Sequence, residues 1–505
     1  MQERTLTIYF TSDIHGFFYP LDYATGKTVE RGLMKCANRF QKDGNTLILD
    51  GGDILQGSPF TAYCHDRLRD PEPIARIMNA CGYDYVALGN HDFNFGQEYL
   101  ASYLKALDAQ CLCQNCLDDS GKSRYPYTVH VLENGLRVGL VGLVTDHVNV
   151  WEKAENLEGC RIVNPFDAAK SALDALQGQV DLTVCLYHGG FERDLKTGAL
   201  LTQSTENIGY RICEELGFDL LLTGHQHMHV YGRSLRGTYT LQPSEFGREF
   251  FKITLTVGQE KQIHAQCIAA EGRCPEELMR LLAPEEEQLQ NWLDERVGEM
   301  EQALQPSDRI FMASHGSTIA EFFNMVQQDF SGAQISVTSL ANEIAGLPKL
   351  VRRRDVLTTY PYQNTLKVLE ITGQQLRCAM ERSAEYFALD ANGQITISET
   401  FLKPKIEHYN YDYFRGIDYV FDISRPVGQR VVRMWFNGLD VQPSDTFTVC
   451  VSDYRASGTG GYPMYPACPI IREYDTQIAD MIMKYFENHP YVGKMETGRF
   501  QVICG

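Results

Sequence analysis

Side chains that can bind metal ions follow five separate apolar segments of this 505-residue sequence. These candidate ligands are Asp13, His15, Asp53, Asn90, His188, His225 and His227. Their mixture of nitrogen and oxygen donors suits Mn, Zn, Co or Fe better than Ca, and the lack of cysteine ligands argues against a structural zinc site. The set is large enough for two divalent ions that share one carboxylate. Two such ions ~3.5–4 Å apart can clamp a phosphoryl group and deliver a hydroxide nucleophile.

Predicted strands position these side chains. Short apolar runs lie at residues 6–10, 46–49, 85–88, 138–144, 182–187 and 220–223. Helical patterns separate them, at residues 33–42, 73–80, 98–109, 166–176 and 206–215. Strands that alternate with helices of this length favour a layered α/β fold. Because the loops at the carboxyl ends of such strands form the ligand crevice, we expect the seven candidate ligands to converge.

The pattern changes after residue 270. A stretch rich in Glu, Gln and Leu has no glycine between Arg273 and Gly298, which predicts a linker helix within residues 271–306. Its acidic run at residues 285–287 is typical of a solvated helix face. The remaining residues, 307–505, have strands and turns of their own. The sequence therefore predicts two domains, 1–270 and 307–505, joined by this linker.

The charge balance restricts the class of partner. Lys and Arg number 46 against 65 Asp and Glu, which gives a net charge of −19. Polymeric nucleic acid requires a basic stripe that displaces counterions, so we expect no such partner. A small anionic substrate remains compatible with this acidity, because a bound cation can reverse the field locally.

The compartment is predicted from the cysteines and from the N-terminus. No apolar signal region follows a basic start, and no run approaches the ~20 apolar residues of a membrane span, so we expect no membrane partner. The fifteen cysteines are irregularly spaced and odd in number. Reduced thiols in a cytoplasmic protein explain this pattern. An exported form whose signal has been removed has the same appearance, and the oligomeric state is left open.

The order of the motifs resembles a known family. Asp13-Ile14-His15-Gly16, Gly51-Gly52-Asp53, Gly89-Asn90-His91-Asp92, His188-Gly189-Gly190 and Gly224-His225-Gln226-His227 look like the motifs of the calcineurin-like metallophosphoesterases. More narrowly, they resemble the bacterial 5′-nucleotidase / 2′,3′-cyclic-nucleotide 2′-phosphodiesterase family. Residues 360–365, 426–430 and 454–458 look like the C-terminal domain of that family. The resemblance implies a layered αββα catalytic domain at 1–270 and an α+β specificity domain at 307–505.

The resemblance also implies the role of each candidate. Asp13, His15 and His227 would hold one divalent ion, Asn90, His188 and His225 the other, and Asp53 would bridge them. His91 is not a ligand in this family, where it faces the phosphate as a proton donor or charge stabiliser. The implied protein is a metal-dependent phosphoesterase of nucleotide catabolism that acts on a small nucleotide.

One position departs from the pattern of the 5′-nucleotidases. In those enzymes an Asp three residues after the catalytic His orients its ring, whereas this sequence has Asn94. An Asn can fix the imidazole of His91 by hydrogen bonding, but it cannot raise the pKa of the ring as a carboxylate would. This motif and His227 look more like the cyclic-phosphodiesterase branch, so we expect a 2′,3′-cyclic-nucleotide 2′-phosphodiesterase/3′-nucleotidase. A 5′-nucleotidase, a nucleotide-sugar pyrophosphatase and a catalytically silent nucleotide-binding module are the alternatives.

The second domain is expected to bind the base. Bases are commonly held by stacking on aromatic faces, and the family places the base between two aromatic side chains. We expect Tyr409 and Tyr454 in this role, with Tyr411 as the alternative to Tyr409. A separate cluster, Cys111, Cys113 and Cys116, has no matching second cluster. We therefore expect a structural role for these cysteines.

Overall fold

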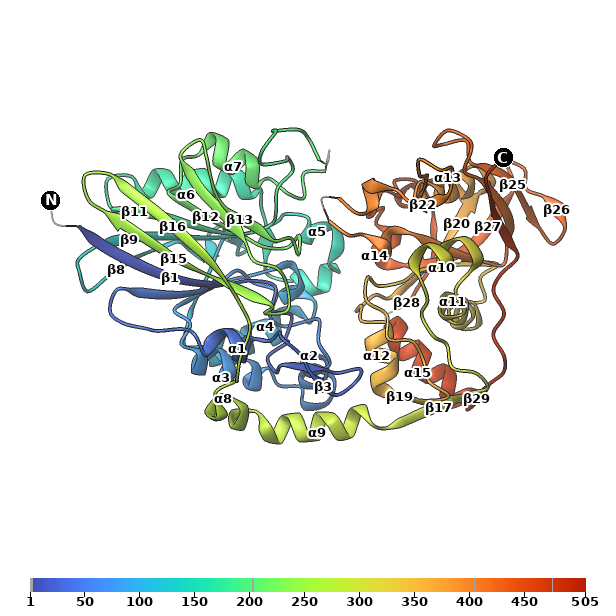
Figure 1. Ribbon diagram of the computed structural model, residues 1–505, viewed down its shortest axis with the longest axis horizontal. Helices are drawn as coiled ribbons and strands as arrows, with labels where there is room; N and C mark the ends of the chain where they lie inside the picture. The colour runs from blue at the N-terminus through green and yellow to red at the C-terminus, as the bar shows by residue number, and fades with distance from the viewer. Residues whose placement is uncertain (1–2, 202–203, 404, 475) are drawn as a thin grey trace. The chain divides into compact units, whose positions relative to one another are not determined.

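The computed structural model describes residues 3–201, 204–403, 405–474 and 476–505. The chain forms two compact units, Met1–Leu289 and Gln290–Gly505. Figure 1 draws the first unit in blue to yellow-green and the second in yellow to red. Each unit has its own sheets and its own buried core.

The first sheet of the first unit is built around parallel neighbours. β1 (Arg4–Thr11) pairs with β4 (Thr46–Asp50), and β4 pairs with β5 (Tyr85–Ala87). The other strands are β6 (Gln110–Leu117), β7 (Ser123–Tyr125), β10 (Arg161–Ile162), β15 (Glu249–Val257) and β16 (Lys261–Ala269). Since parallel neighbours end at the same edge, the loops after β1, β4 and β5 lie side by side.

The second sheet also has a parallel centre. β11 (Leu182–His188) lies between β9 (Arg137–Val144) and β12 (Leu220–Thr223), and all three are parallel. The strands that complete it are β8 (Thr128–Val131), β13 (Val230–Leu235) and β14 (Thr238–Gln242). The six strands predicted for this half of the chain are therefore confirmed.

The two sheets pack face to face, with helices outside. Leu6 of β1 and Leu140 of β9 belong to one buried cluster between the sheets. On the outer face of the second sheet, Phe166 belongs to the cluster that α6 (Pro165–Leu176) and α7 (Gly209–Glu215) form with that sheet. Helices therefore cover the second sheet on the side away from the first.

The outer face of the first sheet is also covered. Tyr9 points to this face, and its ring centroid lies 5.1 Å from that of Phe40. Figure 1 shows α1 and α3 beside this sheet. The helices of this region are α1 (Leu33–Ala37), α2 (Pro59–Tyr63), α3 (Glu72–Cys81), α4 (Gly96–Ala106) and α5 (Val148–Trp151). The predicted αββα layering is thus confirmed.

The predicted linker contains less helix than expected. The helical part consists of α8 (Glu276–Leu281) and α9 (Ala283–Leu293). It is followed by β17 (Arg296–Met300), which pairs with residues 350–352 and 491–492. These partners are distant in sequence, so the local pattern that predicted a helix up to residue 306 could not reveal the strand.

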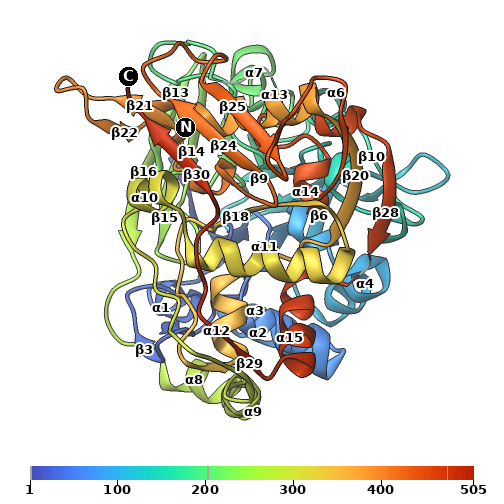
Figure 2. The same ribbon diagram turned by 90° about the vertical axis from the view of Figure 1, so that its right-hand side faces the viewer.

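The second unit is a mixed α+β structure. Its largest sheet contains β18 (Ile335–Ser339), β20 (Leu366–Thr372), β23 (Asp412–Arg415), β27 (Thr446–Ser452) and β28 (Ile470–Tyr474). Figure 2 shows α11 (Thr318–Ser331) crossing in front of β18. Other helices are α10 (Arg309–His315), α12 (Arg353–Thr359), α13 (Gly373–Ala384), α14 (Asp453–Ala456) and α15 (Ile478–Asn488).

Smaller sheets complete the second unit. One contains β17, β19 (Leu350–Arg352) and β29 (Tyr491–Val492). Another contains β24 (Asp418–Asp422), β25 (Val431–Phe436), β26 (Leu439–Asp440) and β30 (Phe500–Ile503). A single buried cluster that draws on both α11 and these sheets forms the core.

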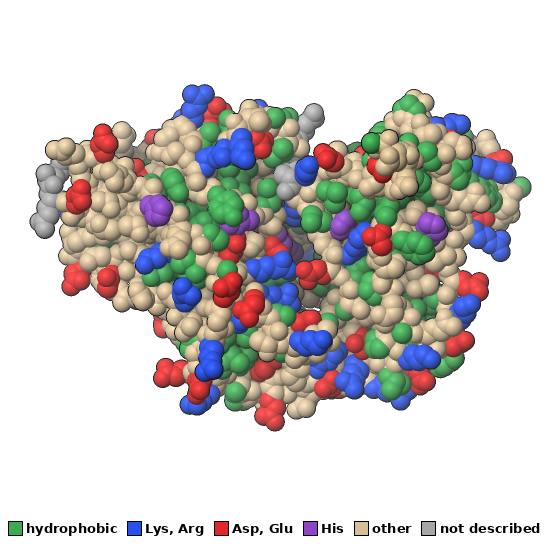
Figure 3. Space-filling view, in the orientation of Figure 1, with side chains coloured by type: hydrophobic (Ala, Val, Ile, Leu, Met, Phe, Trp, Pro, Cys, Tyr) green, Lys and Arg blue, Asp and Glu red, His purple; other side chains and the backbone are tan. Residues whose placement is uncertain are grey.

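The surface charge is mixed. Figure 3 shows acidic and basic side chains interspersed over the described residues on one face of the molecule. The net charge of −19 is therefore spread over many sites. Among the described helices, none is long and apolar enough to cross a bilayer.

Candidate active site

Five strand ends bring the predicted ligands together. Asp13 and His15 follow β1, Asp53 follows β4, Asn90 follows β5, His188 ends β11, and His225 and His227 follow β12. Two backbone bonds join the first two loops: Asp13 N donates to Gly52 O (3.0 Å) and His15 N donates to Asp53 O (2.8 Å). The backbone N–H of His225 donates to Asp13 Oδ1 (2.9 Å), which ties the second sheet to the first. All seven candidates lie in this one region.

One cluster of ligand atoms contains Asp13, His15 and His227, whose donor atoms lie within 4.8 Å of one another. His15 Nε2 is 2.9 Å from His227 Nε2, and His227 Nε2 is 3.5 Å from Asp13 Oδ1. His15 uses Nδ1 to donate to Gln56 O (2.8 Å), which leaves the lone pair of Nε2 directed into the cluster. Burial lowers the pKa of His15 to about 4, although Asp53 opposes this shift, so the ring is neutral at pH 7.

A second cluster contains Asp13, Asp53 and His188. His188 Nδ1 donates to Gly51 O (2.8 Å), and its Nε2 lies 3.1 Å from Asp53 Oδ2. This buried Nε2 makes no well-aligned hydrogen bond with any described residue. When His188 gives up its Nε2 proton, the lone pairs of Nε2 and Asp53 Oδ2 face each other at this distance and suit a metal ion between them. Asp53 approaches both clusters, because its Oδ2 is also 3.6 Å from His15 Nε2.

The remaining two candidates meet beside the second cluster. His225 Nδ1 is 2.8 Å from Asn90 Oδ1, and the rings of His225 and His188 are 5.5 Å apart. The other nitrogen of His225, Nε2, is 2.7 Å from Glu206 Oε1. Glu206 therefore fixes the orientation of this ring, a role for which the sequence contained no motif.

The electrostatics of the site favour divalent cations. Burial opposes ionisation of Asp53, but His188 and His91 outweigh it and hold the pKa of the carboxyl well below its usual value. Burial also opposes protonation of His188, but Asp53 and Asp13 raise the pKa of this ring to about 10. Without a metal ion, a proton on His188 thus balances part of the carboxylate charge. A metal ion that binds there replaces this proton.

The ligand loops are conformationally strained. Nine non-glycine residues among those described have positive φ, and five are candidate ligands: Asp13, His15, Asp53, His225 and His227. Such a backbone costs of order 1–3 kcal/mol per residue and persists only where the surroundings over-determine it. The strain is concentrated at the site, which is typical of a functional centre.

Asp92 holds the loop that carries Asp53. Its Oδ2 accepts from Asp53 N (2.9 Å) and Gly89 N (2.8 Å), while Oδ1 accepts from Ile54 N and Leu55 N (both 2.9 Å). At Gly89 a Cβ atom would collide with Asp53 Oδ1, so this position requires glycine. Asp92 belongs to the motif Gly89-Asn90-His91-Asp92. Its four backbone partners could be found only from the fold.

His91 lies beside the clusters without joining either. Its backbone N–H donates to Asp53 Oδ1 (2.8 Å), and its ring centroid is 5.4 Å from that of His15. Its Nδ1 is 2.8 Å from Asn94 Oδ1. The structure therefore brings the predicted orienting residue, Asn94, to the predicted catalytic ring.

The tyrosines predicted to bind the base lie in the second unit. Arg455 Nη2 donates to Tyr409 O (2.9 Å), and the guanidinium lies 5.8 Å from the ring centroid of Tyr454, so these two half-buried tyrosines belong to neighbouring segments. Tyr411 differs, because it is only 2% exposed and its hydroxyl donates to Ala313 O (2.9 Å). Tyr411 is therefore a core residue, which corrects its prediction as an alternative base platform.

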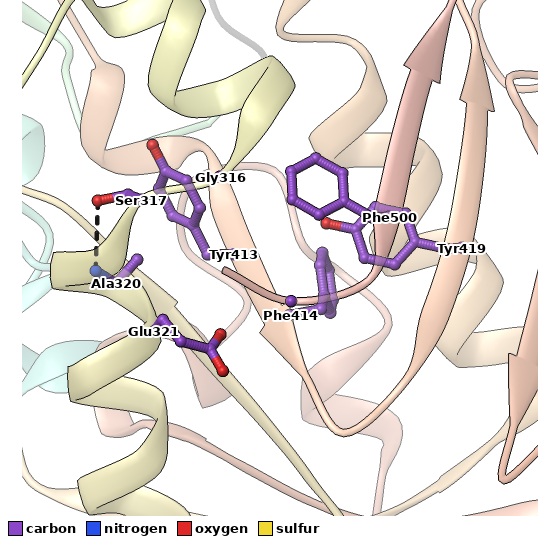
Figure 4. Close-up of a pocket in the computed structure, with 9 residues that line it drawn as sticks. Gly316, Ser317, Ala320, Glu321, Tyr413, Phe414, Tyr419 and Phe500 are labelled. Carbon is purple, nitrogen blue, oxygen red and sulfur yellow. Dashed lines mark hydrogen bonds between the residues drawn. The ribbon is translucent and has the colours of Figure 1, made fainter. Parts of the chain in front are cut away.

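A small, partly open pocket also lies in the second unit. Figure 4 shows the rings of Tyr413, Tyr419 and Phe500 around it, together with Glu321. Glu321 forms an ion pair with Arg415, so its charge is already compensated. None of the predicted base-binding tyrosines lines this pocket.

Two other clusters lie apart from the candidate ligands. His229, Glu249 and Cys267 come together, but Glu249 accepts hydrogen bonds from both partners, so these carboxylate contacts need no ion. Cys111, Cys113 and Cys116 lie on β6 and belong to none of the described ligand groups. All fifteen cysteines are free thiols.

Comparison with known proteins agrees with this geometry. The family model of the calcineurin-like phosphoesterases matches residues 6–229, which hold all seven candidate ligands. The model of the 5′-nucleotidase C-terminal domain matches residues 297–467. The fold and site therefore define a metallophosphoesterase.

Individual relatives point to nucleotide chemistry. The chain is 24% identical to the 2′,3′-cyclic-nucleotide 2′-phosphodiesterase/3′-nucleotidase of Salmonella typhimurium, over 90% of this chain and 81% of that protein. It is 25% identical to the trifunctional nucleotide phosphoesterase YfkN of Bacillus subtilis over 95% of its length, but spans only 38% of that protein. A candidate 5′-nucleotidase from Staphylococcus aureus, solved with α-ketoglutarate, matches with a TM-score of 0.92 and 29% identity, covering 99% of this chain and 100% of the other.

Residues 6–229 form a calcineurin-like phosphoesterase domain, and residues 297–467 form a 5′-nucleotidase C-terminal domain. It is a metal-dependent phosphoesterase, a hydrolase that acts on ester bonds. The family predicted from the motif order is therefore confirmed.

Proposed function

We propose that the protein is a two-metal phosphohydrolase that acts on nucleotides. The observation that supports this most strongly is the pair of adjacent ligand clusters. They have Asp13 in common, and Asp53 Oδ2 lies 3.6 Å from His15 Nε2 of the first and 3.1 Å from His188 Nε2 of the second. We assign one ion to Asp13, His15 and His227, the other to Asn90, His188 and His225, and both to Asp53. When bound, such ions supply Lewis-acid stabilisation of the phosphoryl oxygens and an activated water.

His91 is assigned the transfer of a proton to the leaving oxygen. Nδ1 donates to Asn94 Oδ1 at 2.8 Å. The ring must therefore carry a second proton on Nε2, as an imidazolium, and it gives this proton to the leaving oxygen of a substrate held at the clusters. A positioned acid of this kind typically contributes 10²–10⁴-fold to the rate. Asn94 is assigned the orientation of the ring.

The proposed substrate is a 2′,3′-cyclic nucleotide, which is opened by the 2′-phosphodiesterase activity and then dephosphorylated by the 3′-nucleotidase activity. The motif around Asn94, His227 and the Salmonella relative support this choice. The Staphylococcus structure supports a 5′-nucleotidase as the second candidate, and a nucleotide-sugar pyrophosphatase is the third.

A substrate panel separates these candidates. We expect 2′,3′-cyclic AMP and 3′-AMP to be cleaved faster than 5′-AMP and UDP-glucose. The panel is run with Mn, Co, Zn and Mg in turn, because the mixed nitrogen and oxygen ligands suit several ions. Manganese-loaded protein that cleaves neither bis(p-nitrophenyl) phosphate nor any nucleotide would instead indicate a silent binding module.

We infer that the base is held by Tyr409 and Tyr454 of the C-terminal domain. Arg455 contacts the segments of both tyrosines and is itself held in a buried ion pair with Asp412 (2.9 Å). This ion pair holds the two segments firmly together. We assign residues 1–270 to the catalytic domain, 271–306 to the linker and 307–505 to the specificity domain. The family models at 6–229 and 297–467 support this division.

We propose a reducing, cytoplasmic location. The fifteen free cysteines, many of them buried, support it, because disulfides are rare where thiols are kept reduced. Fractionation of the native host, with detection by antibody, tests this assignment, and recovery outside the cytoplasm would contradict it.

A further inference from the structure

Glu152 lies next to the pair formed by His91 and Asn94. It is the first residue after α5, and its side chain is half-buried. Asn94 Nδ2 donates to Glu152 Oε1. The other carboxylate oxygen accepts from Asn156 Nδ2 (2.8 Å), and the same nitrogen donates to the backbone carbonyl of Asn94 (3.0 Å). Glu152 and Asn156 therefore hold both the side chain and the backbone of Asn94.

The chemistry of these groups determines how Asn94 is oriented. An ionised carboxylate only accepts hydrogen bonds, so the amide nitrogen of Asn94 must face Glu152. The amide oxygen must then face His91, where Nδ1 lies 2.8 Å away. An amide oxygen only accepts, so His91 carries its proton on Nδ1 when the ring is neutral. Without Glu152, Asn94 could rotate and present its nitrogen to the ring.

We propose that Glu152 is a positioning residue that acts on His91 through Asn94. The side chain that contacts the ring of His91 is the amide of Asn94. Glu152 supplies a carboxylate behind that amide, on the side away from the ring. The hydrogen bond from Asn94 is charge-assisted, and such bonds are roughly twice as strong as neutral ones. The inference rests on the proposed function only in that His91 is taken to act on substrate.

Removal of the side chains of Glu152 and Asn94 tests whether Glu152 acts on His91 through Asn94. Glu152→Ala and Asn94→Ala should each lower kcat roughly 10-fold, which is a part of the contribution of a positioned acid. The double variant should lose no more than Asn94→Ala alone, because Glu152 acts through Asn94. KM and bound metal should stay within about twofold in all three variants. Additive losses, or equal losses of metal and activity, would show that Glu152 only supports the local fold.

An exchange of the amide and the carboxylate gives a sharper test. Asn94→Asp alone places the new carboxylate in contact with that of Glu152. Two carboxyl groups in contact cannot both ionise freely, because their negative charges repel. We therefore expect Asn94→Asp to be impaired. Adding Glu152→Gln restores the network: the new amide donates to the new carboxylate, which still accepts from His91 Nδ1, while the amide oxygen still accepts from Asn156. The double variant should recover kcat to within about threefold of wild type. Failure to exceed Asn94→Asp would overturn the proposal.

Glu155→Gln is the matched control, because it removes the same charge three residues away. Glu155 is 73% exposed and lies 3.9 Å from Lys153. This variant should retain wild-type kinetics.

A measurement without substrate distinguishes this inference from the proposed function. In protein labelled with ¹⁵N-histidine, the Nδ1–H signal of His91, assigned by its loss in His91→Ala, should be present in wild type and weakened or lost in Glu152→Ala. An unchanged signal would contradict the inference even if the substrate panel succeeds. A wild-type protein that cleaves no nucleotide would refute the proposed function while this signal still tests Glu152.

Discussion

Asp53 places one carboxylate oxygen near the histidines of both clusters. Its Oδ2 lies 3.6 Å from His15 Nε2 and 3.1 Å from His188 Nε2, while Oδ1 accepts from the backbone of His91. Asp92 in turn holds the backbone N–H of Asp53. A single buried side chain thus relates both proposed ions to the proposed acid.

Replacement of this carboxylate should reduce metal binding. Asp53→Asn keeps the size of the side chain but removes the negative charge that both ions are proposed to share. We expect bound manganese to fall from two ions per chain to at most one, as measured by elemental analysis after equilibrium dialysis. Asp108→Asn, at an exposed position, is the control and should bind two ions. Full occupancy in Asp53→Asn would contradict the bridging assignment.

Replacement of His91 should separate catalysis from metal binding. His91→Ala removes the proposed proton donor but none of the candidate ligands, so kcat should fall on the order of 10²–10³-fold. Bound metal, measured in the same way, should remain near that of wild type. His264→Ala, an exposed histidine on β16, should change neither quantity. A parallel loss of metal and turnover would instead place His91 among the ligands.

At the scale of elements, the candidate ligands and the proposed base-binding tyrosines lie on different kinds of segment. The loops after β1, β4 and β12 carry ligands in the strained left-handed region, with φ between 51° and 71° at the five candidate ligands. In the second unit, the segment before β23 and the helix α14 carry the two proposed base-binding tyrosines, and Arg455 connects them. The proposed chemistry thus depends on loops of the first unit, and the proposed base recognition depends on segments of the second.

Removal of one platform ring should weaken nucleotide binding selectively. Stacking of a base on an aromatic ring contributes about 1–3 kcal/mol, so Tyr454→Ala should raise KM for 2′,3′-cyclic AMP roughly 5- to 150-fold. Bis(p-nitrophenyl) phosphate has no nucleobase, and its hydrolysis should be unchanged.

Tyr411→Phe is the matched comparison, because Tyr411 is a core residue that donates to Ala313 O. It should lower the free energy of unfolding by about 1 kcal/mol with little effect on KM. A larger rise in KM for Tyr411→Phe than for Tyr454→Ala would overturn the assignment of the platform.

At the scale of the whole molecule, the division into two units separates metal binding from the C-terminal core. All seven candidate ligands lie within Met1–Leu289, and the buried core of the second unit contains none of them. A ligand that binds only the folded state stabilises it by mass action. Bound metal should therefore stabilise the first unit directly.

Removal of metal should lower the unfolding temperature of the first unit. At a free metal concentration 100 times Kd, binding contributes about 2.7 kcal/mol per ion, which chelation abolishes. Trp151 provides a local probe, because its ring stacks 5.5 Å from His225, whereas Trp292 and Trp435 lie in the second unit. In a Trp292→Phe/Trp435→Phe background, the fluorescence transition should shift down on chelation. An unchanged transition would argue against metal binding at this site.

The sequence by itself determined the fold class, the family and the seven candidate ligands, because each depends on local information. Apolar runs such as residues 182–187 form buried strands, and a short polar motif such as Gly224-His225-Gln226-His227 stands directly at a strand end. Asn94 could be identified as the partner of His91 because it is only three residues away.

Only the tertiary structure decided the contacts between residues far apart in the chain. Glu152 lies 58 residues after Asn94, and β17 depends on pairing with residues 350–352 and 491–492. Tyr409 and Tyr411 are both tyrosines of one short segment, so the sequence cannot distinguish them. Packing places Tyr411 in the core and leaves Tyr409 half-buried. Hydrogen bonds and burial depend on which surfaces meet when the chain folds, and that information is not contained in any local pattern.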